Sequence, residues 1–483
     1  MARGDGGDNL RAGVEPSGVP RVLDGRVATT APETHHEAGA DPRDRLAREL
    51  GTVDTTMLVV SSVIGSGIFL TPAAIAGLLP HPGLILAAWL VGGLLSLAGA
   101  LANAELGAMY PHAGGDYVYL REGYHPAAGF LIGWLSFFVI YAGTVASLAA
   151  AFAEALAPHL GLGAAAVVAL AIGAVTVTSA INYAGVRRGV QVNNWSSYLK
   201  LAGVTGFVLA AFLVGGGSAT RLAPLIAGAT SAAPLAAFGL ALSPVLFTYL
   251  GWNAPVYVAS EIRDPARTLP RSLFLGLGIC TLAYLALNVV YLYALPLDGL
   301  HAEPNAGAAS ARALFGPLAG QLTSAFVVAS ILGTLNAAIL VGPRIAYAMA
   351  LDGLFVGGAH EVHPDYHTPH RAIVVQGIVA IALLLVLRRF PSVLDYTTFA
   401  IVLATMADTA VLYRLRRKRP DLRRPYRAWG YPVIPALYLV ANAGVAAAML
   451  WGRPFECAIG LGVLLAGWPF YAWLRPGSAA RGA

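Results

Sequence analysis

Long apolar runs recur along this 483-residue chain, and they constrain its fold more than any other feature. A run of about 20 apolar residues is long enough to cross the hydrocarbon core of a bilayer as a helix. Charged residues make up 12% of the chain, hydrophobic residues make up 57%, and the mean hydropathy is +0.66. Soluble domains carry about 25% charged residues. The sequence therefore predicts an all-α polytopic membrane protein.

Twelve such runs predict twelve transmembrane helices. They cover residues 55–79, 83–109, 126–157, 163–182, 190–214, 235–260, 270–295, 317–348, 371–388, 392–413, 430–451 and 455–474. Residues 1–50 hold no apolar run, so we expect a disordered cytoplasmic tail without a cleavable signal peptide. Residues 51–474 are the predicted membrane domain, and residues 475–483 are a short cytoplasmic C-terminal tail.

The positive charges predict the orientation of the chain. Arginines gather in the loops after even-numbered runs, above all in the stretch 414–427, and are sparse in the other loops. The positive-inside rule then places both termini in the cytoplasm. The net charge of +6 therefore indicates topology rather than nucleic-acid binding. The stretch 414–419 either anchors this topology or contacts anionic lipid headgroups. The Ala-, Gly- and Arg-rich usage favours a GC-rich bacterium, and hence its inner (plasma) membrane.

Two of the runs contain an internal break. The first break lies within residues 63–70 and includes Gly65-Ser66-Gly67, and the second lies within residues 243–253, which include Pro244 and Gly251. Glycine costs about 1 kcal/mol in a helix interior relative to alanine. Backbone groups left unpaired at membrane depth are tolerated where they line a cavity, and matched breaks in two halves of a chain indicate a transporter's central site. Close helix packing through small residues is the alternative explanation of Gly65-Ser66-Gly67.

Five stretches that include these breaks follow one another in a characteristic order. They are residues 64–69, 111–119, 247–253, 261–270 and 344–353. Together they resemble the amino acid–polyamine–organocation superfamily, especially its L-type amino acid transporter branch. The resemblance implies a LeuT-like five-plus-five inverted repeat, with spans 1 and 6 broken and two peripheral spans. It also implies secondary transport of amino acids by alternating access, as exchange, facilitated diffusion or proton-coupled uptake.

Helix ends supply the chemistry that this resemblance implies. Free N–H groups at a break can hold a carboxylate, and free carbonyls can accept from an ammonium group. By resemblance, the amides of Ser66, Gly67 and Ile68 meet the α-carboxylate, carbonyls of both breaks meet the α-ammonium, and Phe247 acts as a gate. The predicted substrate-binding residues are Val63, Ile64, Gly65, Ser66, Gly67, Ile68, Phe247, Thr248, Leu250 and Asn253.

Two further residues refine the predicted function. Leu250 stands where large-substrate members of the superfamily commonly have glycine, so we expect small or medium neutral L-amino acids. Lys200 lies inside the fifth run. By resemblance to sodium-independent members, its ammonium takes the place of a sodium ion, touches the carbonyls of residues 63–65 and couples spans 1 and 5. Snorkelling to the membrane interface is the alternative for Lys200.

Other chemistry-bearing residues were weighed. Glu105, Glu154 and Asp408 are acids in or near spans, and each is either functional or a boundary or packing residue. The histidines of residues 360–370 have irregular spacing, so we predict no metal site and no cofactor. Eukaryotic members pair with a glycoprotein through a cysteine after span 3. The loop 158–162 lacks cysteine, so no disulfide-linked partner is expected there.

Three rival functions stay open from sequence alone. A polyamine or other organic-cation carrier of the same fold needs acidic or aromatic groups in its cavity. An integral-membrane enzyme needs a nucleophile or metal constellation, and we find no such motif, so we predict that the chain is not an enzyme. A non-transporting sensor needs the same binding site. The partners we expect are an amino acid and the lipid bilayer, with no nucleic acid.

Overall fold

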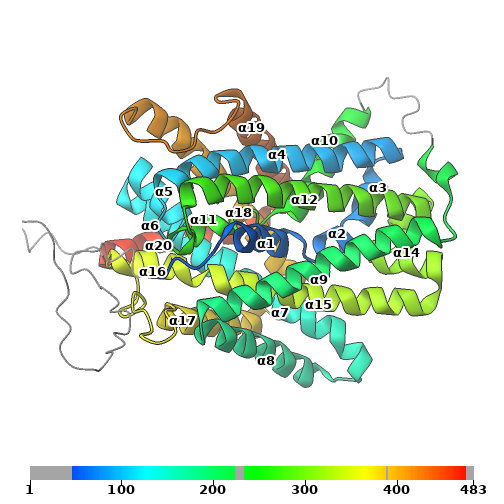
Figure 1. Cartoon of the computed structure of the whole chain (residues 1–483), viewed down its shortest axis with the longest axis horizontal. Coiled ribbons are helices and arrows are strands. Elements are labelled where there is room, and N and C mark those ends of the chain that lie inside the picture. Colours follow the sequence, from blue (N-terminus) through cyan, green and yellow to red (C-terminus); the bar gives the residue numbers. More distant parts are fainter. Residues whose placement is uncertain (1–45, 224–232, 388–389, 475–483) are drawn as a thin grey trace, which may run out of the picture. The chain divides into compact units, whose positions relative to one another are not determined.

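The computed structural model describes residues 46–223, 233–387 and 390–474, which form helices joined by short connections (Figure 1). These described residues contain no strand, and one isolated β-bridge pairs Leu50 with Ile262. The helices are α1 (Thr52–Val63), α2 (Gly67–Leu70), α3 (Pro72–Leu78), α4 (Pro82–Met109), α5 (Asp116–Gly123), α6 (Pro126–Leu135), the π-helix η2 (Ser136–Tyr141), α7 (Ala142–Leu160), α8 (Ala164–Tyr183), α9 (Val186–Leu213), the 3-10 helix η3 (Ala219–Leu222), α10 (Ala233–Tyr249), α11 (Ala254–Tyr257), the 3-10 helix η4 (Ala259–Glu261), α12 (Pro265–Ala294), α13 (Leu297–Ala302), α14 (Ala306–Phe315), α15 (Pro317–Val341), α16 (Pro343–Leu351), α17 (His370–Leu387), α18 (Phe390–Lys418), α19 (Val433–Gly452) and α20 (Pro454–Leu474).

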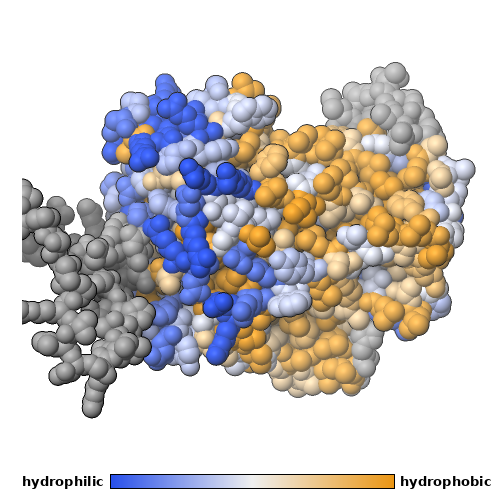
Figure 2. Space-filling view, in the orientation of Figure 1, coloured by the Kyte–Doolittle hydropathy of each residue, from blue (hydrophilic) through white to orange (hydrophobic). Residues whose placement is uncertain are grey.

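The helices have the length and the surface of membrane spans. Ten helical segments of the described chain are long and apolar enough to cross a bilayer, and two shorter apolar helices cover Ala237–Tyr249 and His370–Val386. Large apolar side chains such as Leu213, Leu282 and Leu318 are exposed on α9, α12 and α15, where Figure 2 shows an apolar surface. Lipid, unlike water, solvates such side chains. The prediction of an all-α polytopic membrane protein is confirmed, whereas the count of twelve spans and the inverted repeat stay predictions.

Both predicted breaks are present. The first run is helical to Val63 and resumes at Gly67, and the sixth is helical to Tyr249 and resumes at Ala254. Gly251 has φ of +98°, and a Cβ atom at this position would meet the Ser62 carbonyl oxygen at 2.9 Å. Only glycine adopts this conformation and permits this approach at low cost. The two breaks are therefore packed against each other.

The ends of the chain stay largely outside the described residues. Both tail predictions concern mainly residues 1–45 and 475–483, for which no structure is described. Leu46 and Leu50, which we assigned to the N-terminal tail, are buried. Leu50 donates to the Glu261 carbonyl and accepts from the Arg263 amide, at 2.9 Å each. The packed part of the chain therefore begins ahead of α1.

Buried ion pairs hold the helices together away from the breaks. The Glu105 carboxylate on α4 accepts hydrogen bonds from Arg416 at 3.0 and 2.5 Å and from the Ala428 amide at 2.6 Å. Arg344 on α16 forms a bidentate pair with Glu261, at 2.7 and 2.9 Å. Glu105 thus has a packing role that ties α4 to the last turn of α18 and to the segment after it. Glu154 is exposed on α7.

Candidate functional site

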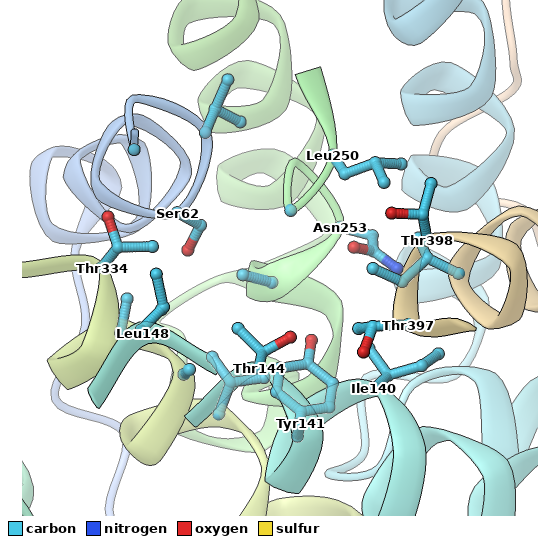
Figure 3. Close-up of a pocket in the computed structure, with 18 of the residues that line it drawn as sticks. Ser62, Ile140, Tyr141, Thr144, Leu148, Leu250, Asn253, Thr334, Thr397 and Thr398 are labelled. Atoms are coloured by element: carbon cyan, nitrogen blue, oxygen red, sulfur yellow. The ribbon is translucent and has the colours of Figure 1, made fainter. Parts of the chain in front are cut away.

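A cavity of about 150 Å³ lies where the two breaks meet (Figure 3). An engineered cavity that binds benzene has a volume of the same order. The predicted residues that line it are Val63, Gly65, Ser66, Gly67, Phe247, Thr248, Leu250 and Asn253. Ile64 and Ile68 are fully buried outside this lining. Eight of the ten predicted binding residues therefore converge on one cavity, while their roles, including that of Phe247 as a gate, stay predictions.

The first break presents unpaired N–H groups at the cavity and directly behind its wall. Within the described chain, the amides of Ser66, Gly67 and Ile68 donate to no backbone or side-chain acceptor, because α1 has ended and α2 is only beginning. The Gly67 backbone lies against Thr248 of the second break, since a Cβ atom at Gly67 would meet the Thr248 Cγ2 atom at 3.0 Å. Three consecutive free donors, two of them on residues that line the cavity, are suited to a carboxylate.

The carbonyls released by the breaks face other partners. Tyr284 of α12 donates to the Val63 carbonyl at 2.7 Å, and it also lies 3.1 Å from the Thr248 carbonyl. One hydroxyl thus bridges the ends of α1 and α10. The Ile64 carbonyl accepts from Ser330 at 3.4 Å. A carbonyl oxygen has two lone pairs, so each keeps capacity for a further donor such as an ammonium group.

Hydroxyl groups line much of the remaining wall. In Figure 3, Leu250 and Thr398 lie on one side of the cavity, Ser62 and Thr334 lie on the opposite side, and Tyr141 lies between them. No Asp, Glu, Lys or Arg occurs among the described lining residues. The wall therefore offers hydrogen bonds and apolar surface without a formal charge.

Sequence reasoning missed the cavity residues of the third, eighth and tenth spans. They are Ile140, Tyr141, Thr144, Ser147, Leu148, Thr334, Ala337, Ala338, Val341, Thr397, Thr398, Ile401 and Ala404. The available signal was the hydroxyl side chains inside otherwise apolar runs. Tyr141 ends the π-helical turn η2, a local feature that frequently marks functional sites and that sequence periodicity does not reveal.

Lys200 lies behind the first break and is 1% exposed. Its ammonium donates to the Ser61 carbonyl and to the Thr334 hydroxyl, at 2.9 Å each. The predicted contact with the carbonyls of residues 63–65 was thus displaced by about half a helical turn. The reason is that α1 ends at Val63, which leaves the Ser61 carbonyl without an intrahelical donor. The alternative that Lys200 snorkels to the interface does not fit this burial.

The described chain shows neither a metal site nor a disulfide. Its residues contain no cluster of three or more His, Cys, Asp or Glu side chains arranged to hold a metal ion. Cys280 and Cys457 are both buried as free thiols.

Comparison with known proteins agrees with this geometry. The sequence pattern of a family described as amino acid permease matches residues 50–455. The chain belongs to the amino acid permease family. This permease is 30% identical to the serine/threonine exchanger SteT of Bacillus subtilis, over 90% of its own length and 98% of the relative's.

Mammalian relatives are also similar to this permease. It is 29% identical to the large neutral amino acids transporter small subunit 2 of Homo sapiens, over 88% of this chain and 80% of that protein. It is 27% identical to the Asc-type amino acid transporter 1 of Mus musculus, over 89% of this chain and 82% of that protein. These relatives are named as transporters or exchangers, not as enzymes.

Proposed function

We propose that this permease is a sodium-independent secondary transporter of small or medium neutral L-amino acids that works by alternating access. The observation that carries the proposal is that free N–H groups of residues 66–68 and backbone carbonyls of both breaks lie around the same cavity. A zwitterion presents one carboxylate and one ammonium group. Opposed helix ends can therefore bind both charges without a charged side chain.

The cavity wall supports the proposed substrate size and polarity. Leu250 fills part of one side, and Thr144 and Tyr141 bring hydroxyl-bearing side chains to the wall that a polar substrate side chain would meet. The name of the serine/threonine exchanger among the relatives agrees with a small hydroxylated substrate. The absence of a carboxylate from the described lining disfavours a polyamine or other organic cation, because a multiply charged cation needs compensating anions.

Lys200 supports the proposed independence from sodium. Its ammonium already supplies a positive charge to the Ser61 carbonyl at the end of α1. A sodium ion bound at the same place would meet like-charge repulsion. We place this permease in a bacterial inner (plasma) membrane with both termini in the cytoplasm, in accord with the arginine-rich stretch 414–427.

Uptake by purified protein in liposomes tests this function. Radiolabelled serine, threonine, alanine, leucine, tryptophan and putrescine are offered to empty and to serine-loaded vesicles, with potassium or sodium as the cation. We expect uptake of the small and medium neutral amino acids in both salts. Uptake of putrescine alone would instead support the organic-cation carrier. Substrate binding without any flux would support a sensor.

A further inference from the structure

A pair of buried carboxyl groups lies beside the cavity and is unused by the proposed substrate chemistry. Asp116 begins α5, directly after the turn at Gly114 and Gly115, and Asp408 lies in the middle of α18. Both side chains are fully buried, and their carboxyl groups are within hydrogen-bond reach of each other. The helices α5 and α18 pack together, which fixes the pair.

Only one of the four oxygen atoms of the pair accepts hydrogen bonds from described donors. The Asp116 Oδ2 atom accepts from the Tyr257 hydroxyl and, at 3.3 Å, from Ser136. The other Asp116 oxygen and both oxygens of Asp408 receive no hydrogen bond from any donor in the described chain. Two ionised carboxylates are acceptors only, so they cannot hydrogen-bond to each other. A shared proton supplies the missing donor.

The charges around the pair lead to the same conclusion. The titratable groups that face it are tyrosines of four different elements, namely Tyr119 of α5, Tyr141 of η2, Tyr257 of α11 and Tyr438 of α19. No described Lys, Arg or His neutralises the two acids. Two unpaired negative charges a few ångströms apart in a dry interior would repel strongly, and one site then retains a proton.

Two residues around α11, in the broken sixth span (segment 6, residues 235–260), connect the carboxyl pair to the cavity. Tyr257, which donates to Asp116, also lines the cavity. Asn253, another lining residue, donates to the Tyr257 hydroxyl at 3.3 Å. Ala404, one helical turn before Asp408, lines the cavity as well. A bound substrate at Asn253 is thus two hydrogen bonds from Asp116.

We propose that Asp116 and Asp408 form a proton-binding site that couples proton movement to the transport cycle. The pair holds one shared proton while α5, α11 and α18 are packed as they are here. A conformational change that withdraws Tyr257 of the broken segment 6 admits water, so that each carboxyl group is solvated separately and the proton passes to that water. The proton is released to water on the inner side of the membrane, and reclosure takes one proton from water on the outer side, so each cycle carries one proton inward and returns the pair to its starting state. The coupling rests on the proposed transport function, whereas the proton site itself does not.

The proton site is tested without transport. Infrared spectra of the purified full-length protein are recorded at neutral pH, and the spectrum of Asp408→Asn is subtracted from that of the wild type. We expect a protonated-carboxyl C=O stretch in the wild type that the variant lacks, because Asp116 alone, with two donors, ionises. The Glu154→Gln variant is the matched control and should retain the band. A difference spectrum without this band overturns the site.

The coupling is tested in liposomes with radiolabelled serine and a pH-sensitive dye inside. We expect a proton gradient, acidic outside, to drive serine accumulation and proton entry by the wild type and by Glu154→Gln, and to drive neither by Asp408→Asn. Wild-type uptake that ignores both pH and the gradient overturns the coupling. An absence of serine flux at every pH would instead contradict the proposed function, and the infrared band would still decide the proton site.

A second variant addresses the case in which Asp408→Asn does not fold. Ser136→Ala removes one hydrogen bond to the ionised form of Asp116, and Ser136 does not line the cavity. Serine uptake is measured as a function of pH, and the midpoint of this profile should move to higher pH in Ser136→Ala. Beyond the midpoint, the protonated fraction of the carboxyl pair should change about tenfold per pH unit. A variant that lowers uptake equally at all pH values, with an unmoved midpoint, would show a merely structural role and overturn the coupling.

Discussion

Replacing Lys200 by methionine separates the transport role of this side chain from its contribution to folding. Lys200 of α9 makes two charge-assisted hydrogen bonds, to α1 through the Ser61 carbonyl and to α15 through Thr334. Hydrogen bonds to charged groups contribute about 1.5–3 kcal/mol each, so the two together favour the packed arrangement by about 3–6 kcal/mol. Even the lower figure is roughly a hundredfold in an equilibrium constant.

Folding should be affected much less than transport. Burying an ammonium group costs several kcal/mol, and an apolar side chain of similar length avoids that cost, which offsets the hydrogen bonds that it loses. The Ser61 carbonyl also keeps a donor, because the Thr334 hydroxyl lies 3.1 Å from it. Lys200→Met should therefore keep its melting temperature within a few degrees of the wild type while losing at least about tenfold in serine uptake.

The measurements are thermal unfolding in detergent and uptake into liposomes. Lys418→Met is the matched control, since Lys418 is the only other lysine of the chain and ends α18. Lys200→Ala should also lose transport. Lys200→Arg should not restore it, because the larger planar head fits this packed position poorly. Full uptake by Lys200→Met, or strict sodium dependence of the wild type, would refute the reasoning.

Three further outcomes follow from the geometry. Gly67→Val should abolish the thermal stabilisation of the folded protein by serine, because the added atoms meet Thr248 and cover the free amides. Gly278→Ala, on an open face of α12, is the control and should leave the stabilisation unchanged. Equal stabilisation of the wild type and both variants would remove the carboxylate site. Leu250→Gly should widen uptake to tryptophan, and equal wild-type uptake of alanine and tryptophan would contradict the role of Leu250. Burial raises the pKa of the Asp116 carboxyl above its usual range, so its stabilising contribution is full at acidic pH and is lost as the pH rises through the raised folded-state pKa. The melting temperature should accordingly fall from acidic toward neutral pH, and Asp116→Asn should flatten that slope. A wild-type melting temperature that rises over this pH range would contradict the stabilising role of protonated Asp116.

The sequence alone determined where the apolar helices of this permease lie along the chain and roughly where two of them break. Apolar runs report directly on helices that lie in lipid, so the predicted spans coincide with helices or broken helices of the structure. The breaks were predictable to within residues 63–70 and 243–253 for the same local reason, since Gly65, Gly67 and Gly251 disfavour a continuous helix, while the structure fixed their bounds at residues 64–66 and 250–253. Eight residues beside those breaks reach the cavity because chain neighbours of a break necessarily lie near it.

Only the tertiary structure decided which distant residues meet. Nothing in the pattern around Lys200 specifies the Ser61 carbonyl or the Thr334 hydroxyl as partners, because those contacts depend on how α9 packs against α1 and α15. The same holds for the cavity wall formed by η2 and α18. It holds most of all for Asp116 and Asp408, which are separated by more than half of the chain and in sequence resemble an ordinary loop acid and a helix-boundary acid. Helical periodicity fixes the face on which a side chain lies, whereas the packing of helices fixes what that face touches.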